Sequence, residues 1–218
     1  MNIETRQCED GSSTLYLPDM DETYHSIHGA ITESQHVYIE AGLAQFHSGE
    51  VTILEFGFGT GLNALLSLRF ANETELVLKY FSVEKFPLGQ EQLASLNYGA
   101  RLDMQTEWTR LHQIAWNEWQ EWGKNHQLYK YEGDFREIDL PENSCDLLYY
   151  DAFAPSKQPE VWSMDYLAMA YRCLKSGGIL VTYCAKGQFR RDIESLGFAV
   201  SRLGGPPGKM EMIRAQKI

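Results

Sequence analysis

The sequence predicts an α/β fold, in which a mostly parallel sheet of seven strands carries helices on both faces. Short apolar runs typical of buried strands alternate with helical patterns along nearly the whole chain. The first run leads into a glycine-rich turn that begins a helix, as in the βα units of parallel sheets. With 218 residues and no internal repeat or linker, the chain is expected to form one domain.

The first predicted elements lie on either side of the glycine-rich turn. Thr32 is a suitable N-cap for a helix over residues 33–47. The apolar run at residues 51–56 predicts a buried strand, and the leucine-rich residues 62–71 predict the helix after the turn. Residues 76–83 predict the second strand of the sheet.

The middle of the chain continues the alternation. Pro87 favours the start of a short helix that reaches about Leu96. Methionine, leucine and tryptophan side chains recur at helical spacing and predict one long, packed helix over residues 104–122. Residues 128–131 and 145–150 predict two more strands.

The last third begins with a helix and ends with strands. Pro159 favours the start of a helix that we expect to end at the glycines 177–178. The remaining predicted elements are a strand over residues 179–183, a helix over 188–196, and strands over 198–202 and 209–217.

The composition is that of a globular protein. Hydrophobic residues make up 44% of the chain and aromatic residues 12%. No apolar run approaches the roughly 20 residues that span a bilayer, and the first residues lack the basic start and apolar core of a signal peptide. The four cysteines form no Cys-x-x-Cys pair. We therefore expect a cytoplasmic protein.

The charge is unevenly distributed. The net charge of −11 argues against a nucleic-acid partner. However, residues 1–150 carry 9 basic and 24 acidic side chains, a balance of −15, whereas residues 151–218 carry 10 and 6, a balance of +4. A basic final third is compatible with a local anion-binding face, although solvated surface charge is the commoner explanation.

The glycine-rich turn, Glu55 to Gly61, indicates the ligand. A dinucleotide-binding pattern would need glycine at Leu62, and a phosphate-binding P-loop would need a Gly-Lys-Ser/Thr ending. An acidic residue followed by three alternating glycines (Gly57, Gly59 and Gly61) is typical of proteins that bind S-adenosylmethionine. A tight turn without a ligand is the alternative.

Acidic residues lie at or just past the ends of four predicted strands: Glu55, Glu84, Asp134 and Asp151. Because the carboxyl ends of parallel strands meet at one edge of a sheet, these side chains are expected near one another. Glu84 is well placed to accept hydrogen bonds from a ribose diol, and Asp134 to orient an adenine amino group. The set predicts a nucleoside site.

Several segments resemble the methyltransferase domain of the MnmC family, which makes 5-methylaminomethyl-2-thiouridine at the wobble position of tRNA. The resemblance covers nearly the whole chain, and Asp-Ala-Phe-Ala-Pro is its most specific motif. The matching segments are EFGFGTGLN at residues 55–63, VEKFPL at 83–88, YDAFAPSKQPEVW at 150–162, GQFRR at 187–191 and the N-terminal residues 21–37.

The resemblance implies a class I S-adenosylmethionine-dependent methyltransferase fold, Rossmann-like, over residues 1–218, with 1–48 as an extension that covers the pocket. It implies N-methylation of the 5-aminomethyl group of wobble (2-thio)uridine in tRNA, with Asp151 beside the amine. The implied cofactor-binding residues are Glu55, Gly57, Gly59, Gly61, Asn63, Glu84 and Asp134. The expected substrate-binding residues are Tyr24, Phe153, Pro155, Lys157, Arg190 and Arg191. Lys186 and Lys209 are further candidates for tRNA contacts.

The chain departs from the family pattern in two ways. Phe56 stands where a small residue is expected. The sequence also contains no second glycine pattern, so the flavin-dependent half of the bifunctional enzyme is expected to be absent. A separate enzyme would then supply the aminomethyl-uridine precursor.

Two other functions stay open at this point. One is a metal-dependent O-methyltransferase acting on a small phenol, with Asp151 as a ligand, although the neighbouring Phe-Ala-Pro residues add no oxygen ligands. The other is a cofactor- and RNA-binding module without turnover. The pair His25 and His28 has no third ligand at suitable spacing, so we expect no metal.

Overall fold

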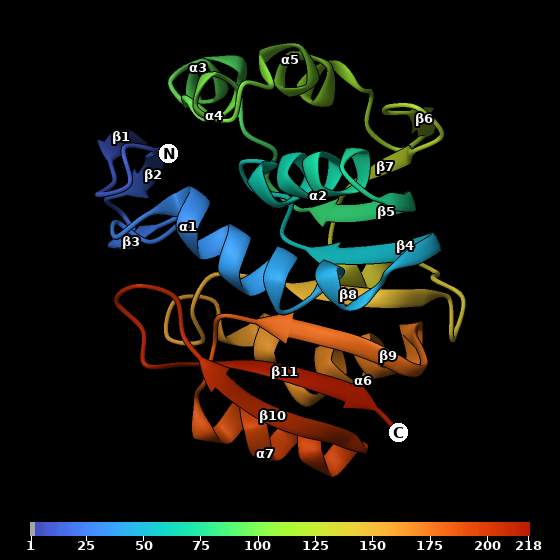
Figure 1. Ribbon diagram of the computed structural model, residues 1–218. Helices are drawn as coiled ribbons and strands as arrows, with labels where there is room; N and C mark the ends of the chain where they lie inside the picture. Colours follow the sequence, from blue (N-terminus) through green and yellow to red (C-terminus); the bar gives the residue numbers. More distant parts are fainter. Residues whose placement is uncertain (1–2) are drawn as a thin grey trace.

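The computed structural model describes residues 3–218, which form a large sheet and a small one (Figure 1). The large sheet has eight strands in the order β10-β11-β9-β8-β4-β5-β7-β6. The five strands from β9 to β7 are parallel, whereas β11, β10 and β6 run antiparallel to their neighbours. Their bounds are β4 Ser48–Phe56, β5 Glu75–Glu84, β6 Trp119–Glu121, β7 Gln127–Glu132, β8 Cys145–Tyr150, β9 Leu174–Thr182, β10 Phe198–Gly204 and β11 Glu211–Lys217.

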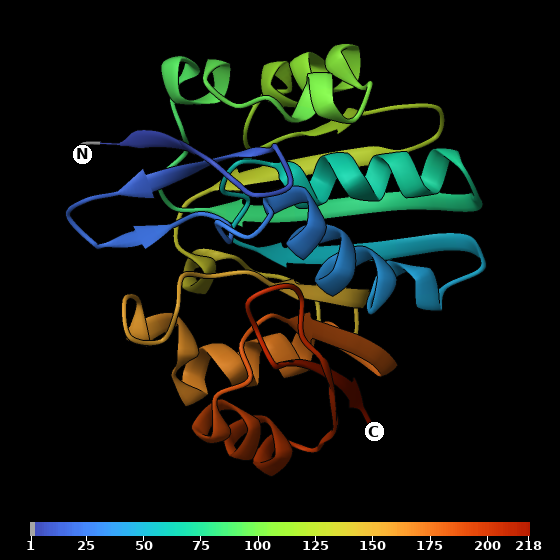
Figure 2. The ribbon, with the colours of Figure 1, turned by 60° about the vertical axis from the view of Figure 1, so that its left-hand side comes forward.

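Helices cover both faces of this sheet, so the predicted α/β class is confirmed (Figure 1; Figure 2). Helices α1, α2 and α5 pack on one face, and α6 and α7 pack on the other. The helices are α1 Ala30–Ser34, α2 Leu62–Asn72, α3 Gln90–Ala94, α4 Tyr98–Arg101, α5 Gln105–Gln113, α6 Met164–Cys173 and α7 Gly187–Leu196. A π-helical segment (Gln35–Glu40) extends α1, and 3₁₀ turns occur at Leu43–Gln45, Phe135–Glu137 and Pro159–Trp162.

Strand β8 shows why the carboxyl halves of the central strands are rich in apolar residues. Its side chains alternate, so Leu147 and Tyr149 belong to the core beneath α2, whereas Leu148 and Tyr150 belong to the core beneath α6 and α7. All four side chains are buried, whereas Asp146, nearer the start of the strand, is partly exposed and pairs with Lys175. Residues 147–150 are covered on both faces, which explains the continuous apolar run there.

The strand count differs from the prediction because β6 adds an eighth strand to the large sheet. The small sheet, β1 (Glu4–Gln7), β2 (Ser13–Leu17) and β3 (Glu22–Thr23), was not predicted either. Strand β1 is exposed over its whole length and shows no apolar alternation. Short strands of this kind carry too little periodic signal for prediction from sequence.

The prediction that Thr32 caps the first helix is wrong. The helix begins at Ala30, and Thr32 lies in its first turn. The free backbone N–H groups there donate to distant side chains: Ala30 to Ser12 Oγ at 3.1 Å, and Thr32 to Asp10 Oδ2 at 3.1 Å. Capping by residues some 20 positions away is invisible to rules on local sequence.

The long helix predicted over residues 104–122 is also wrong. Helix α5 ends at Gln113, and Asn117 adopts a φ of 65° while its N–H donates to Lys130 O at 2.7 Å. Trp119 then pairs with Tyr129 in the β6–β7 ladder. Pairing with the edge of β7 therefore outweighs the helical spacing of the apolar residues.

The helix predicted to end at glycines 177–178 ends earlier. Helix α6 stops at Cys173, and strand β9 follows at once. The two glycines lie inside β9, beside an irregularity in its pairing with β8 between Cys145 and Leu147. Helix α3 is likewise shorter than predicted, and the helix predicted over residues 33–47 ends at Glu40, before a separate 3₁₀ turn. The other predicted strands and helices are confirmed with shifts of up to five residues in their bounds. No helix within residues 3–218 has the length and apolar content needed to cross a membrane.

Candidate active site

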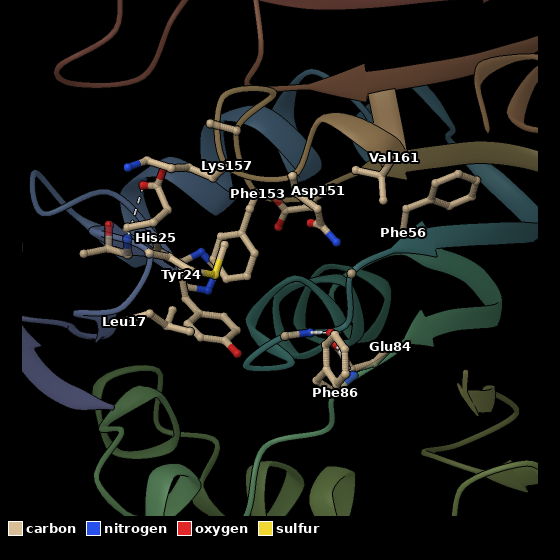
Figure 3. Close-up of a pocket in the computed structure, with 18 of the residues that line it drawn as sticks. Leu17, Tyr24, His25, Phe56, Glu84, Phe86, Asp151, Phe153, Lys157 and Val161 are labelled. Carbon is tan, nitrogen blue, oxygen red and sulfur yellow. Dashed lines mark hydrogen bonds between the residues drawn. The ribbon is translucent and has the colours of Figure 1, made fainter. Parts of the chain in front are cut away.

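A cavity of about 790 Å³ opens at the carboxyl ends of the central strands (Figure 3). Strand β4 lies between β5 and β8, and the chain order reverses at β4, which makes this edge the topological switch point of the sheet. The ends of β4, β5 and β8 contribute to the cavity wall, and the N-terminal residues 16–27 form the opposite side.

The glycine-rich turn follows β4 and leads into α2. Gly57, Gly59 and Gly61 have φ values of 91°, 51° and 78°, which glycine adopts without steric cost. A Cβ atom on Gly57 would overlap the carbonyl oxygen of Asp151, so glycine allows the ends of β4 and β8 to approach closely. Gly57 and Gly59 line the cavity, and Gly61 is the N-cap residue of α2.

Glu84, the last residue of β5, ties this turn to the sheet. Its Oε2 accepts the N–H of Gly59 at 2.9 Å, and its Oε1 accepts the N–H of Phe86 at 2.8 Å. Burial raises the pKa of the Glu84 carboxyl. Figure 3 shows Glu84 beside the ring of Phe86 at the cavity wall. Each carboxylate oxygen keeps a second lone pair for a ligand hydroxyl.

Asp134 also lines the cavity, but its carboxylate already accepts hydrogen bonds from neighbouring protein groups. It caps the 3₁₀ turn after β7 through Arg136 N at 3.0 Å, and it accepts bonds from Arg136 Nε at 3.1 Å, Lys85 Nζ at 3.0 Å and the Tyr166 hydroxyl at 2.8 Å. The Arg136 guanidinium holds the pKa of Asp134 well below its usual range. In this arrangement the carboxylate stays ionised.

Asp151 follows β8 and lies at the cavity beside Phe153 (Figure 3). Its Oδ1 accepts the hydroxyl of Tyr38 at 2.5 Å, and its Oδ2 accepts Nδ2 of Asn63 at 2.7 Å. Burial raises the pKa of Asp151 to about 7. Burial thus favours the neutral form of Asp151, whereas the fixed donor on each oxygen favours the charged form.

Glu55 and Asn63 lie behind the cavity wall. Glu55 is fully buried, and its two oxygens accept Asn63 Nδ2 at 3.0 Å and Ser82 Oγ at 2.6 Å. Burial raises its pKa to about 8. Neither Glu55 nor Asn63 lines the cavity, nor does Gly61, so these expected site residues form the layer that supports it.

Aromatic side chains form the apolar part of the wall. Tyr24 and Phe153 meet edge to face with centroids 5.1 Å apart, and the Tyr24 ring lies against Gly59. In Figure 3 the Tyr24 hydroxyl points toward Glu84 and Phe86. Pro155 does not line the cavity. Phe56, the departure from the family pattern, is buried and packs on Tyr150 with centroids 4.9 Å apart.

The basic residues expected to contact substrate separate into two groups. Lys157 and Lys209 line the cavity, and Lys209 Nζ donates to Glu33 Oε1 at 2.6 Å and lies 3.8 Å from the centroid of the Tyr183 ring. Three others do not line it: Lys186, Arg190 and Arg191. The two arginines belong to α7. Cations that line the cavity but were missed from sequence are Arg6, Lys85 and Arg136.

The two histidines of the pair have separate partners. His25 is buried, and its Nε2 lies 2.7 Å from Thr60 Oγ1 of the glycine-rich turn. Burial lowers its pKa to about 4, so the ring is neutral at pH 7. His28 pairs instead with Glu9 at 3.0 Å. Within residues 3–218, no group of three or more His, Cys, Asp and Glu side chains is arranged to hold a metal ion.

Comparisons with known proteins agree on one family. A family model described as S-adenosyl-L-methionine-dependent methyltransferase matches residues 103–218. Two relatives named tRNA 5-methylaminomethyl-2-thiouridine biosynthesis bifunctional protein MnmC come from Cupriavidus necator and Nitrosospira multiformis. They are 33% and 31% identical over 90% and 92% of this chain. The alignments cover 32% and 35% of these relatives, so the chain spans about a third of their length.

A solved structure shows the same architecture over nearly the whole chain. The crystal structure of MNMC2 from Aquifex aeolicus superimposes with a TM-score of 0.82 and is 26% identical. The match covers 99% of this chain and 70% of that one. The extent of the match includes the N-terminal segment that lies over the cavity.

Proposed function

The chain belongs to the family of S-adenosyl-L-methionine-dependent methyltransferases, and we propose that it methylates the nitrogen of a 5-aminomethyl group on the wobble uridine, or 2-thiouridine, of tRNA. The observation that carries the proposal is Asp151, whose carboxylate lies at the cavity next to the glycine-rich turn. The names of the MnmC relatives, which specify a methylaminomethyl nucleoside of tRNA, supply the substrate class.

The cavity fits S-adenosylmethionine. Its volume of about 790 Å³ lies within the usual range for ligand pockets. Gly57 and Gly59 leave the backbone of the turn bare, and Glu84 has lone pairs free for a ribose diol. We propose that these residues hold the nucleoside. Asp134 would contribute indirectly, by capping the 3₁₀ turn Phe135–Glu137 beside the cavity. The bound cofactor supplies an electrophilic methyl group.

Asp151 then acts on the amine. Alkyl ammonium groups have a pKa near 10, yet only the neutral amine carries the lone pair that attacks a methyl carbon. The Asp151 carboxylate can accept an N–H of the amine, orient it and take its proton. Tyr38 and Asn63 each occupy one lone pair of an oxygen, so lone pairs remain for the substrate.

We propose that the first 48 residues are a cover for this cavity within one domain of 218 residues. Tyr24, His25 and Ile27 line the cavity from this segment, and Tyr38 reaches Asp151. Residues 1 and 2 of this extension lie outside the described residues. A cover of this kind excludes water from the reacting groups.

The proposed activity is tested by incubating the purified protein with methyl-labelled S-adenosylmethionine and either bulk tRNA or a panel of catechols. We expect label in tRNA. Labelling of a catechol that depends on added Mg²⁺ would favour a small-molecule O-methyltransferase. Cofactor and tRNA binding without transfer would favour a non-catalytic module.

A second prediction concerns the precursor. We expect these 218 residues alone to convert 5-aminomethyl-uridine in tRNA but to leave the carboxymethylaminomethyl form unchanged, because oxidative removal of the carboxymethyl group needs a flavin. We propose that a separate enzyme supplies the amine. The measurement is nucleoside mass spectrometry on tRNA from cells blocked at each precursor. Conversion of the carboxymethylated nucleoside by this protein alone would contradict the prediction.

A third prediction concerns tRNA docking at the cavity mouth and the α7 side of it. Phosphate contacts weaken with salt, and each contributes about one unit to the slope of log K against log salt. We expect Lys157→Ala to raise the KM for tRNA and to lower this slope by about one unit. Lys124→Ala, an exposed lysine outside the cavity lining, is the matched control.

Combined Arg190→Ala and Arg191→Ala tests how far the contact surface extends. We expect a smaller rise in the KM for tRNA, since Arg190 already lies 3.8 Å from Glu194 and Arg191 donates to Gln188 at 2.7 Å. If the slope and KM stay unchanged in both the Lys157 and the double-arginine variants, tRNA docks elsewhere.

A further inference from the structure

A buried chain of polar groups reaches from the cavity into the core. Tyr38 donates its hydroxyl to Asp151, and the single amide nitrogen of Asn63 bonds to both Asp151, at 2.7 Å, and Glu55, at 3.0 Å. Tyr38 comes from the π-helical segment Gln35–Glu40, a conformation that is rare and often associated with functional sites. Side chains from two separate elements, the π-helical segment and α2, thus meet at one carboxylate.

The orientation of the Asn63 amide leaves one of its polar atoms without a hydrogen bond within the described part of the chain. Its Oδ1 is buried and accepts no hydrogen bond from any group in residues 3–218. Turning the amide over would satisfy nothing, because its oxygen would then face two carboxylates. The amide gives both of its hydrogens to Glu55 and Asp151 and leaves its oxygen unpaired, which a purely structural core position rarely does.

We propose that Tyr38, Asn63 and Glu55 are positioning residues that fix the direction and the charge of the Asp151 carboxylate. This inference rests on the proposed methyl transfer to an amine and names the residues that prepare its proton acceptor. Tyr38 and Asn63 stabilise the charged form of Asp151 by donating to it, and Glu55 holds the Asn63 amide in place by accepting its other hydrogen.

Glu55 takes the proton of this carboxylate pair, because burial and the charge of Asp151 raise its pKa to about 8. Glu33 of α1 and Lys209 of the β10–β11 loop also face Asp151, but they form an ion pair with each other at 2.6 Å. The hydroxyls of Tyr183, after β9, and Tyr80, in β5, also lie close to Asp151 and stay neutral because burial raises their pKa. Two carboxylates joined through one nitrogen favour sharing a single proton.

The proton of the substrate has a defined route in this network. An N–H bond of the substrate ammonium breaks and an O–H bond forms on Asp151, which frees the nitrogen lone pair to form the N–CH₃ bond. The sulfonium C–S bond breaks with its electrons remaining on sulfur. The proton then leaves Asp151 for solvent through the cavity, and the carboxylate is restored.

The test uses two conservative variants with different expected effects. Tyr38→Phe removes a donor to the charged form, so the acidic limb of the kcat/KM profile against pH should move up by about one unit. Glu55→Gln replaces a protonated carboxyl by a neutral amide, so the limb should stay in place. Asn63→Ser removes the shared donor and should move the limb up, which gives a second variant should Tyr38→Phe not fold.

A titration that needs no turnover separates this inference from the proposed function. Carbon-13 NMR of aspartate-labelled protein, with the Asp151 signal assigned from Asp151→Asn, should show the same upward shift of the Asp151 pKa in Tyr38→Phe and Asn63→Ser, and none in Glu55→Gln, whether or not tRNA is methylated. Tyr149→Phe, which removes a buried hydroxyl bonded to Ser67, is the matched control and should shift nothing. No upward shift in Tyr38→Phe and Asn63→Ser, or an equal upward shift in Glu55→Gln, would overturn the network.

Discussion

Asp151→Asn is expected to lower the rate of methyl transfer by about 10²–10⁴-fold, the usual contribution of a general base or orienting group. The amide keeps the shape of the side chain but accepts no proton at neutral pH. Binding of S-adenosylmethionine should change little, because Glu84 and the glycine-rich turn, rather than Asp151, are proposed to hold the nucleoside. Single-turnover transfer to saturating tRNA, with cofactor binding measured by calorimetry, separates the two effects.

The network around Asp151 can accommodate the new amide. Its oxygen can take the place of Oδ2 and accept Asn63 Nδ2, and its nitrogen can donate to Tyr38, whose hydroxyl can also accept. A loss of activity should therefore not come from unfolding, and an unchanged melting temperature serves as the control. Near wild-type turnover of Asp151→Asn would remove Asp151 from the mechanism.

Gly59→Leu is expected to abolish binding of S-adenosylmethionine. Position 59 has a φ of 51°, and a Cβ atom there would lie 3.2 Å from the Tyr24 ring, so a larger side chain must displace Tyr24 or fill the cavity. In either case the leucine side chain takes up space between the glycine-rich turn and the N-terminal segment, where the cofactor is proposed to bind. Isothermal calorimetry with S-adenosylmethionine is the measurement.

Gly49→Leu is the matched control for this substitution. Gly49 has a φ of 88° in β4, and a Cβ atom there would meet nothing within 4 Å. Both variants carry the cost of a side chain at positive φ, about 1–2 kcal/mol, but only Gly59→Leu alters the cavity. Equal cofactor affinities in the two variants would contradict the assignment of the turn to cofactor binding.

The sequence predicted the parts of the site that local chemistry determines. Backbone positions with positive φ favour glycine, and an acid after a buried parallel strand must lie at the carboxyl edge of the sheet. Gly57, Gly59, Glu84 and Asp151 accordingly lie together at one cavity. Stretches of strand buried on both faces, such as residues 147–150 of β8, are similarly readable from their continuous apolar runs.

Contacts between distant residues were not predictable. Tyr38 and Asp151 are 113 positions apart, and nothing in the spacing of either segment indicates that they meet. The helix boundary near Thr32 depends on Asp10 in the same way. Packing between segments decides such contacts, and a single sequence does not encode them as a periodic pattern.

Glu55 is an intermediate case, because a usable signal was present. Side chains in a strand alternate, and Ile53 faces the core beneath α2, so Glu55 must point to the same side. That side is covered by Asn63 of α2. The alternation of side chains along β4 would therefore have predicted that Glu55 lies under helix α2 rather than in the cavity.

The most direct test of the account is a crystal structure of the protein with S-adenosylhomocysteine and an anticodon stem-loop that carries 5-aminomethyl-uridine. We expect the ribose hydroxyls at Glu84 and the substrate amine within hydrogen-bond distance of an Asp151 oxygen, about 3 Å. An amine bound away from Asp151, or a stem-loop seated outside the cavity mouth, would contradict the account.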